Sequence, residues 1–202
     1  MKKVISAIVL LVILCTLSSC GTAETAVTEP IEPAEIKTVE PPESGWTLEQ
    51  LNKVLYLNGQ QIQLPLMFSS LKDGYEIRNK TYNDVSSLDS NIVGGNLYYE
   101  NNLICMVAFC EMENDIEILS MAFFRDYYKD SQDISKYISI NGFGLQSDIN
   151  EIYSCLGNEY INESELLIYN ITDSDYIISV PNINDLGISL RILNKENYDV
   201  FN

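Results

Sequence analysis

The stretch LYYENNLICMVAFCEMENDIEILSMAFF, residues 97–124, decides the fold that we expect for this chain. Its apolar runs at Leu97–Tyr99, Leu103–Cys110 and Ile116–Phe124 are separated by short polar segments rich in Asn, Asp and Glu, which are typical of turns. Three short apolar runs joined by turns predict a three-stranded antiparallel meander. Leu103–Cys110 is apolar throughout and therefore predicts a central strand that is covered on both faces.

A second group of apolar runs follows towards the C-terminus, at Leu166–Ile171, Tyr176–Val180 and Leu186–Leu193. The segments between them, residues 172–175 and 181–185, are rich in Asp, Asn, Ser and Pro, which favour turns. This pattern predicts a second three-stranded meander.

Each predicted meander is preceded by the same short pattern. Asn58-Gly59 is followed fifteen residues later by Gly74, and Asn141-Gly142 is followed at the same spacing by Gly157. Asn-Gly supplies the positive φ angles of tight hairpin turns, and a later glycine is typical of a helix C-terminus. The two copies lie 83 residues apart, so they are either an internal repeat or a chance match.

A short helix is expected between the turn and the later glycine of each copy. In the second copy Ser147 or Asp148 can cap it, and its apolar stripe at helical spacing consists of Ile149, Ile152, Tyr153 and Leu156. In the first copy, Phe68 and Leu71 after Pro65 predict a shorter helix. The expected fold class is α+β, with two tandem repeats of a helix plus a three-stranded antiparallel meander, in halves at about 45–130 and 131–202.

The N-terminal sequence predicts export. Lys2 and Lys3 precede an apolar stretch, Val4–Leu17, which as a helix would cover roughly 21 Å and fall short of the ~30 Å membrane core. The residues Leu17-Ser18-Ser19-Cys20 resemble the lipobox of a bacterial lipoprotein signal peptide. This resemblance implies removal of residues 1–19 and lipid attachment at Cys20. The alternatives are an ordinary secretory signal and a membrane-anchored N-terminus.

Residues 20–44 contain the expected acylated cysteine and then a stretch rich in Pro and Glu without an aromatic residue. This composition predicts a disordered tether that holds an acidic folded domain, residues 45–202, away from the membrane. The expected location is the extracytoplasmic face of the cell membrane, where the lipid bilayer is the partner of acylated Cys20.

Two further resemblances concern the domain. Asn58-Gly59, Leu64-Pro65, Leu71 and Gly74-Tyr75 resemble a pattern of small Firmicute lipoproteins of unassigned function. The helix-plus-meander plan resembles the β-lactamase inhibitory protein and small outer-membrane assembly lipoproteins. The second resemblance implies a fold and gives no residue a role.

Charge and composition exclude several classes of function. The chain has 29 acidic and 12 basic residues, a net charge of −17, and no histidine. Nucleic-acid binding needs clustered Lys and Arg, so no nucleic-acid partner is expected. Without histidine, the Ser-His-Asp triad and His-ligated zinc are excluded.

The sequence contains no strong catalytic motif, and we expect no catalytic residue, cofactor or metal. Ser69 and Lys72 form Ser-x-x-Lys, the nucleophile motif of penicillin-recognising enzymes, but its partner motifs are missing and a solvated helix face explains these residues better. Cys105 and Cys110 are too far apart on one strand to form a disulfide. We expect all three cysteines to be free, buried thiols; a disulfide between Cys155 and either Cys105 or Cys110 is the alternative.

The clustered carboxylates are interpreted as solubilising surface, because none matches a calcium-binding loop; a carboxylate pair of a glycosidase is the alternative. They are Glu111, Glu113, Asp115, Asp126, Asp130, Asp173 and Asp175.

Phe124, Tyr127 and Tyr128 join the two predicted halves and mix aromatic rings with charge, which suits an interface. The alternative is that these rings close the core between the halves. The function expected from the sequence is a non-catalytic, membrane-anchored module that binds a protein, peptide or cell-wall component. A carboxylate-dependent wall hydrolase and an inhibitor or immunity-type protein are the alternatives; the oligomeric state is left open.

Overall fold

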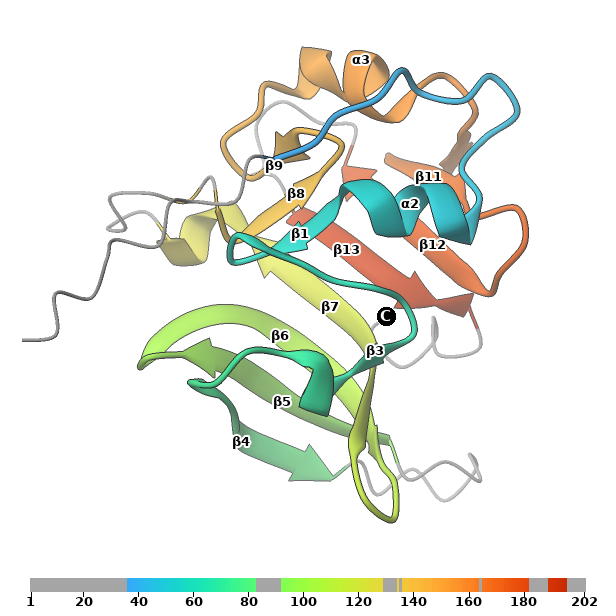
Figure 1. Cartoon of the computed structure of the whole chain (residues 1–202). Coiled ribbons are helices and arrows are strands. Elements are labelled where there is room, and N and C mark those ends of the chain that lie inside the picture. Colours follow the sequence, from blue (N-terminus) through green and yellow to red (C-terminus); the bar gives the residue numbers. More distant parts are fainter. Residues whose placement is uncertain are drawn as a thin grey trace, which may run out of the picture. The chain divides into compact units, whose positions relative to one another are not determined.

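The computed structural model describes residues 36–82, 92–128, 134, 136–163, 165–181 and 189–195, which belong to one unit of the chain, residues 34–202. In this part the chain is mostly antiparallel β-structure, with a four-stranded sheet, a nine-stranded sheet and two short α-helices (Figure 1). The expected α+β fold of two tandem helix-plus-meander repeats is therefore wrong.

Helix α2 (Leu48–Val54) begins the folded domain, and the sequence analysis missed it. Its N-terminus is a capping box, in which Thr47 Oγ1 accepts a hydrogen bond from Gln50 N at 3.2 Å and Gln50 Oε1 accepts one from Thr47 N at 3.0 Å. Leu51 and Val54 are buried. A helix of seven residues is too short to show clear apolar periodicity, so the capping box was the available signal.

The four-stranded sheet joins two hairpins in the order β2-β1-β8-β9. Asn58-Gly59 turns the first hairpin with φ angles of 47° and 73°, and Asn141-Gly142 turns the second with 50° and 87°, so both predicted Asn-Gly turns are confirmed. The two central strands, β1 and β8, pair antiparallel with Tyr56 opposite Ser139, so a local two-fold axis relates the two hairpins. The strands are β1 (Leu55–Leu57), β2 (Gln60–Gln61), β8 (Ile138–Ile140) and β9 (Phe143–Gly144).

The chain after the first hairpin does not form the expected α-helix. It forms strand β3 (Leu66–Met67) and a single 3₁₀ turn, η1 (Phe68–Ser70). Leu66 pairs with Ile118 of the large sheet, and this tertiary pairing holds Leu66 and Met67 in an extended conformation. One helical turn is all that remains before the glycine turn at Gly74.

The chain after the second hairpin forms the predicted helix. Residues Ile149–Glu151 make a 3₁₀ turn, η3, and helix α3 (Ile152–Leu156) follows directly. Asp148 Oδ1 accepts a hydrogen bond from Asn150 N at 2.8 Å at the start of η3, whereas α3 itself has Glu151 at its N-cap and no side-chain capping bond. Gly157 ends α3 with a φ angle of 91°, and its N–H donates to Tyr153 O at 3.0 Å.

The nine-stranded sheet has the order β10-β11-β12-β13-β7-β6-β5-β4, and β3 pairs with β7. Each of the six apolar runs noted in the sequence overlaps one of these strands, while β4 and β10, which form the two ends, were not predicted. The strands are β4 (Tyr75–Tyr82), β5 (Ile92–Tyr99), β6 (Asn102–Glu111), β7 (Ile116–Phe124), β10 (Ile161–Glu163), β11 (Leu166–Asn170), β12 (Tyr176–Pro181) and β13 (Ser189–Asn194).

The two predicted meanders are joined into one sheet. Strand β7 pairs antiparallel with β13, from Phe124 opposite Ser189 to Ser120 opposite Leu193 (Figure 1). Strand β6 lies between β5 and β7, and Phe109 on it is fully buried, which confirms the prediction of a central strand. Apolar runs predict where strands occur, but they do not specify that the last strands of the two meanders pair with each other.

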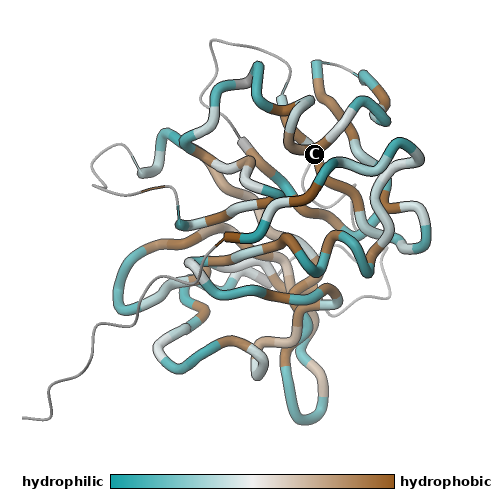
Figure 2. Tube along the Cα trace, turned by 45° about the horizontal axis from the view of Figure 1, so that its top comes forward, coloured by the Kyte–Doolittle hydropathy of each residue, from teal (hydrophilic) through white to brown (hydrophobic). Residues whose placement is uncertain are grey.

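One hydrophobic core serves both sheets and both helices. Its fully buried side chains include Trp46, Leu55, Phe109, Phe143 and Tyr169, which come from the start of the domain and from four different strands. Hydrophobic segments follow the strands and hydrophilic ones the outer turns (Figure 2). Because the domain has no repeated helix-plus-meander unit, the resemblance to the β-lactamase inhibitory protein finds no support in this fold.

Candidate functional site

The lipid-attachment residue expected from the sequence, Cys20, lies outside the described residues, as does the expected signal segment 1–19. No helix within the described ranges combines the length and the apolar character needed to cross a membrane.

The three aromatic residues proposed as an interface have different environments. Tyr128 is buried, and its hydroxyl donates a hydrogen bond to Ile104 O. Tyr127 is 59% exposed and lies 5.2 Å from the half-buried Phe124, measured between ring centroids. One ring therefore closes the core, and the other two form a small surface pair.

The Ser-x-x-Lys residues have structural partners. Ser69 N and its hydroxyl both donate to the carboxylate of Asp115, which also accepts from Ile116 N at 2.7 Å. The hydrogen bond from Ser69 lowers the pKa of Asp115, so this carboxylate is a weak base for activating a nucleophile. Lys72 Nζ lies 4.4 Å from the Tyr99 ring centroid. The hydrogen bonds between Ser69 and Asp115 attach η1 to the β6–β7 turn.

Cys105, Cys110 and Cys155 are all free thiols. Only Cys105 is fully buried, and burial raises its pKa well above the usual value for a thiol. The prediction of free thiols is confirmed, and the prediction of burial holds for one of the three.

The other carboxylates noted in the sequence do not come together. Asp173 Oδ1 accepts a hydrogen bond from Leu48 N at 2.6 Å, at the start of α2. Glu111 pairs with Lys80 at 2.6 Å on the opposite part of the sheet, and Asp130 lies outside the described residues. In the part of the chain that is described, no group of three or more His, Cys, Asp or Glu side chains is arranged to hold a metal ion.

The residues that do come together lie around a segment that we call the strap, residues 36–44. These residues lie within the expected tether, residues 20–44, but they hydrogen-bond to the domain. Asn141 Oδ1 accepts from Val39 N at 2.7 Å, and Asn141 Nδ2 donates to Val39 O at 2.8 Å and to Cys155 O at 2.6 Å. Lys37 N donates to Tyr56 Oη at 3.2 Å. The Asn141 amide thus pairs with both backbone groups of Val39 and links the strap to α3.

The strap passes close to two glycines, one in the second hairpin turn and one at the end of α3. A Cβ atom on Gly142 would lie 3.1 Å from Thr38 Cγ2, and one on Gly157 would lie 3.1 Å from Pro41 Cβ. Both glycines also have positive φ angles, so the same residues that permit the turn and the helix end permit the close approach of the strap.

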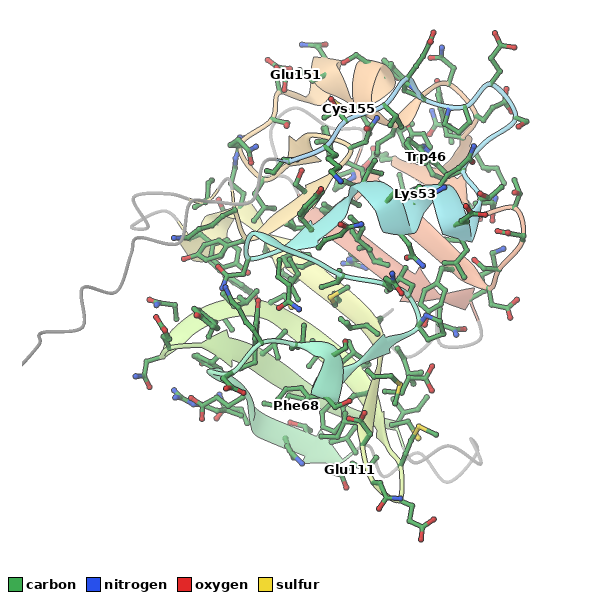
Figure 3. All side chains as sticks on the ribbon, in the orientation of Figure 1. Trp46, Lys53, Phe68, Glu111, Glu151 and Cys155 are labelled. Carbon is green, nitrogen blue, oxygen red and sulfur yellow. The ribbon has the colours of Figure 1, made fainter. Side chains whose placement is uncertain are left out.

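Trp46 fastens the chain just after the strap. Its indole Nε1 donates to Leu156 O at 2.9 Å, at the end of α3, and its carbonyl accepts from Thr172 N at 2.9 Å. The side chain is 1% exposed. Figure 3 shows Trp46 beside α2, with Cys155 and Glu151 on α3.

A pocket of about 280 Å³ opens between the strap and the end of α3. Three of its side chains are glutamates, Glu40, Glu43 and Glu159, and none of them has a basic partner among the described residues. Its lining consists of Glu40, Pro41, Pro42, Glu43, Tyr153, Gly157, Asn158 and Glu159. The pocket therefore combines unpaired carboxylates with an aromatic ring and two prolines.

A row of tyrosines connects the pocket to the core. Ring centroids are 5.6 Å apart for Tyr153 and Tyr160 and 5.8 Å apart for Tyr160 and Tyr169. Tyr169 Oη donates to Gly157 O at 3.2 Å. Hydrogen bonding to Tyr160 raises the pKa of Tyr153, so this phenol stays neutral at physiological pH. Tyr153 remains 40% exposed and presents an aromatic surface at the pocket.

Tyr153 and Gly157–Glu159 of the pocket belong to a long acidic span of the sequence. Residues 137–190 contain no Lys or Arg and eight carboxylates, namely Asp148, Glu151, Glu159, Glu163, Glu165, Asp173, Asp175 and Asp185. The charge of the whole domain does not reveal this span, although its lack of basic residues is visible in the sequence. Pocket formation itself had no local signal, because it needs the strap to dock.

No family model, curated protein or solved structure matches this chain.

Proposed function

We propose that this protein is an extracytoplasmic lipoprotein, anchored through Cys20, whose acidic β domain is a non-catalytic binding module. The observation that carries the binding part is the pocket at the strap, which is lined by the exposed ring of Tyr153 and by three glutamates that have no basic partner in the part of the chain that the structure describes. Carboxylates beside an aromatic ring favour a cationic group, because both the charge and the ring face attract it. The partner is therefore a protein or peptide of the cell envelope that presents a basic group.

Because the strap is bound to the domain, the chain left between Cys20 and the domain is shorter than the expected tether. With residues 36–44 bound to the domain, fifteen residues, 21–35, separate Cys20 from the strap. At ~3.1 Å per residue, the rise of a polyproline-like chain, fifteen residues correspond to about 45 Å. The pocket is formed partly by the strap, so the proposed anchor leads directly to the proposed binding site.

Replacing the proposed lipid-attachment residue, Cys20→Ala, is expected to move the protein from the membrane fraction to the soluble fraction and to abolish incorporation of a labelled fatty acid. Each buried CH₂ of an acyl chain contributes ~0.8 kcal/mol to membrane binding, so loss of the lipid removes the anchor. Cys15→Ala, within the apolar segment of the signal, is the matched control and should leave both unchanged. Full membrane retention of Cys20→Ala without acyl label would contradict the anchor.

A photo-crosslinking amino acid at Tyr153 in the full-length chain is expected to give a discrete adduct in intact cells. Position 153 lies at the pocket and is 40% exposed. Met112, which is 53% exposed on the β6–β7 turn, is the matched control position and should give none. Absence of an adduct from position 153, or equal adducts from both positions, would contradict the proposed binding site.

The hydrolase alternative has a test of its own. Cleavage of purified cell wall by the full chain, lost in Glu159→Gln, would support it.

A further inference from the structure

Strand β10 (Ile161–Glu163) is an open edge of the nine-stranded sheet. It pairs with β11 on one side, from Ile161 opposite Ile168 to Glu163 opposite Leu166, and no strand among the described residues pairs with its other side. All three of its residues are exposed, and Ile161 is 54% exposed. An edge strand presents unpaired N–H and C=O groups that can pair with another extended chain.

The opposite edge of the same sheet is blocked. Strand β4 has a bulge between Arg78 and Thr81, where Asn79 takes a φ angle of 54°. Arg78 pairs with Glu76, and Lys80 pairs with Glu111 at 2.6 Å. Bulges and lysines are common devices that prevent pairing with an edge. Strand β10 has no bulge, no proline and no basic residue, so of the two strands at the ends of the sheet order it is the one left open among the described residues.

The charge around β10 selects its partner. Glu163 lies on the strand, Glu165 lies in the turn after it, and Glu159 of the pocket precedes it by two residues. Since residues 137–190 contain no basic side chain, a second copy of this edge would be repelled. A Lys- or Arg-containing chain would be attracted, because like charges opposite each other destabilise a strand pair and opposite charges stabilise it.

The alternation of side chains specifies the partner further. Ile161 and Glu163 lie two residues apart and therefore share one face of the strand. A strand added beside β10 places one residue next to each of them, so an apolar residue and a basic residue two positions apart are favoured. Glu159, two residues before Ile161, lines the pocket, so a further basic residue two positions along the added strand is favoured there.

We infer that β10 binds an extended, cationic segment of a partner protein by strand addition, with alternating basic and apolar residues on each face. This inference rests on the proposed binding function and names the chemistry of its partner. Backbone hydrogen bonds to the open edge provide the pairing, and Glu163 and the pocket glutamates select a basic sequence.

The test uses the peptide Lys-Lys-Val-Val-Lys-Lys-Val-Val, labelled with a fluorophore, and anisotropy titration against the purified full-length protein. This peptide carries alternating Lys and Val on both faces when extended. N-methylation of one alternate set of its amides is expected to weaken binding at least about tenfold, because it removes the N–H groups that pair with β10; N-methylation of the other set should change affinity less than about threefold. The same peptide with Glu in place of Lys should not bind.

Protein variants locate the interaction. Glu159→Gln combined with Glu163→Gln is expected to weaken binding of the unmodified peptide about three- to tenfold, the size expected for two exposed charge pairs. Glu113→Gln is the matched control; Figure 3 places Glu111, two residues away, at the opposite end of the domain from Cys155 of α3. It should change affinity less than about twofold.

The outcomes separate this inference from the proposed function. Equal binding of both N-methylated peptides, or equal weakening by Glu113→Gln, would mean diffuse charge attraction and would overturn strand addition. Failure of the peptide to bind, together with an adduct from position 153, would overturn the inference and leave the proposed function standing. Absence of that adduct despite peptide binding would contradict the proposed function alone. Concentration-dependent dimerisation blocked by the peptide would assign the edge to a second copy of this chain and overturn the cationic partner.

Discussion

Replacing Trp46 by alanine is expected to lower the free energy of unfolding by about 3–5 kcal/mol, the usual cost of removing a large buried aromatic side chain. Trp46 is 1% exposed and belongs to the core shared by both sheets. It also connects the strap and α2 to the end of α3 through the hydrogen bond from its Nε1 to Leu156 O. Removal of the Trp46 side chain therefore affects the strap, which forms one wall of the pocket. Urea unfolding followed by far-UV circular dichroism measures it, because Trp46 is the single tryptophan and its fluorescence disappears with the substitution.

Trp46→Phe separates packing from hydrogen bonding. Phenylalanine retains most of the aromatic contact but leaves Leu156 O without its donor, so a loss of about 1–3 kcal/mol is expected. Tyr127→Ala is the control for an exposed aromatic ring, since Tyr127 is 59% exposed, and should change stability by less than about 0.5 kcal/mol. Equal stability losses for Trp46→Ala and Tyr127→Ala would contradict the role given to Trp46.

Asn141→Gly is expected to release the strap and to lower the free energy of unfolding by about 2–4 kcal/mol, because it removes three hydrogen bonds, each contributing about 0.5–1.5 kcal/mol. Glycine is chosen because Asn141 has a φ angle of 50°, which glycine adopts without strain. Lys37 is the single basic residue between positions 21 and 44, so trypsin cleavage there reports directly on whether the strap is bound. Cleavage at Lys37 should become at least about tenfold faster, since release of the strap exposes this bond.

Asn58→Gly is the matched control for this prediction. Asn58 occupies the same position in the first hairpin turn, with a φ angle of 47°, and makes no hydrogen bond to the strap. It should leave the rate of cleavage at Lys37 within about twofold of the unsubstituted protein. If both variants accelerate cleavage equally, the Asn141 side chain does not hold the strap and the wall of the pocket has another support.

Local signals in the sequence were reliable where the interaction that produces them spans few residues. The two Asn-Gly turns and the end of α3 at Gly157 were predicted, because each depends on a φ angle or a hydrogen bond within four residues. The helix expected near Phe68 failed because pairing of β3 with β7 overrides a weak local preference. The lipobox at Cys20 stays a prediction.

The candidate site was not predictable in the same way. Its acidic character was present in the sequence as the span 137–190 without Lys or Arg. Its shape was not, because the hydrogen bonds of Asn141 to Val39 join residues 102 positions apart. The Pro- and Glu-rich composition of residues 36–44 predicts a disordered tether, and it gives no information about the surface on which these residues lie in the structure.

The sequence by itself determined the positions of most strands, the two hairpin turns and the negative charge of the domain. These follow from side-chain polarity and from backbone preferences that act over a few residues. The tertiary structure alone decided that β7 pairs with β13, that the strap docks on the Asn141 turn and that β10 lies at the end of the sheet with no second partner strand among the described residues. The physical reason is that these contacts join segments far apart in the chain, where burial of the whole core, and no local preference, selects the partner.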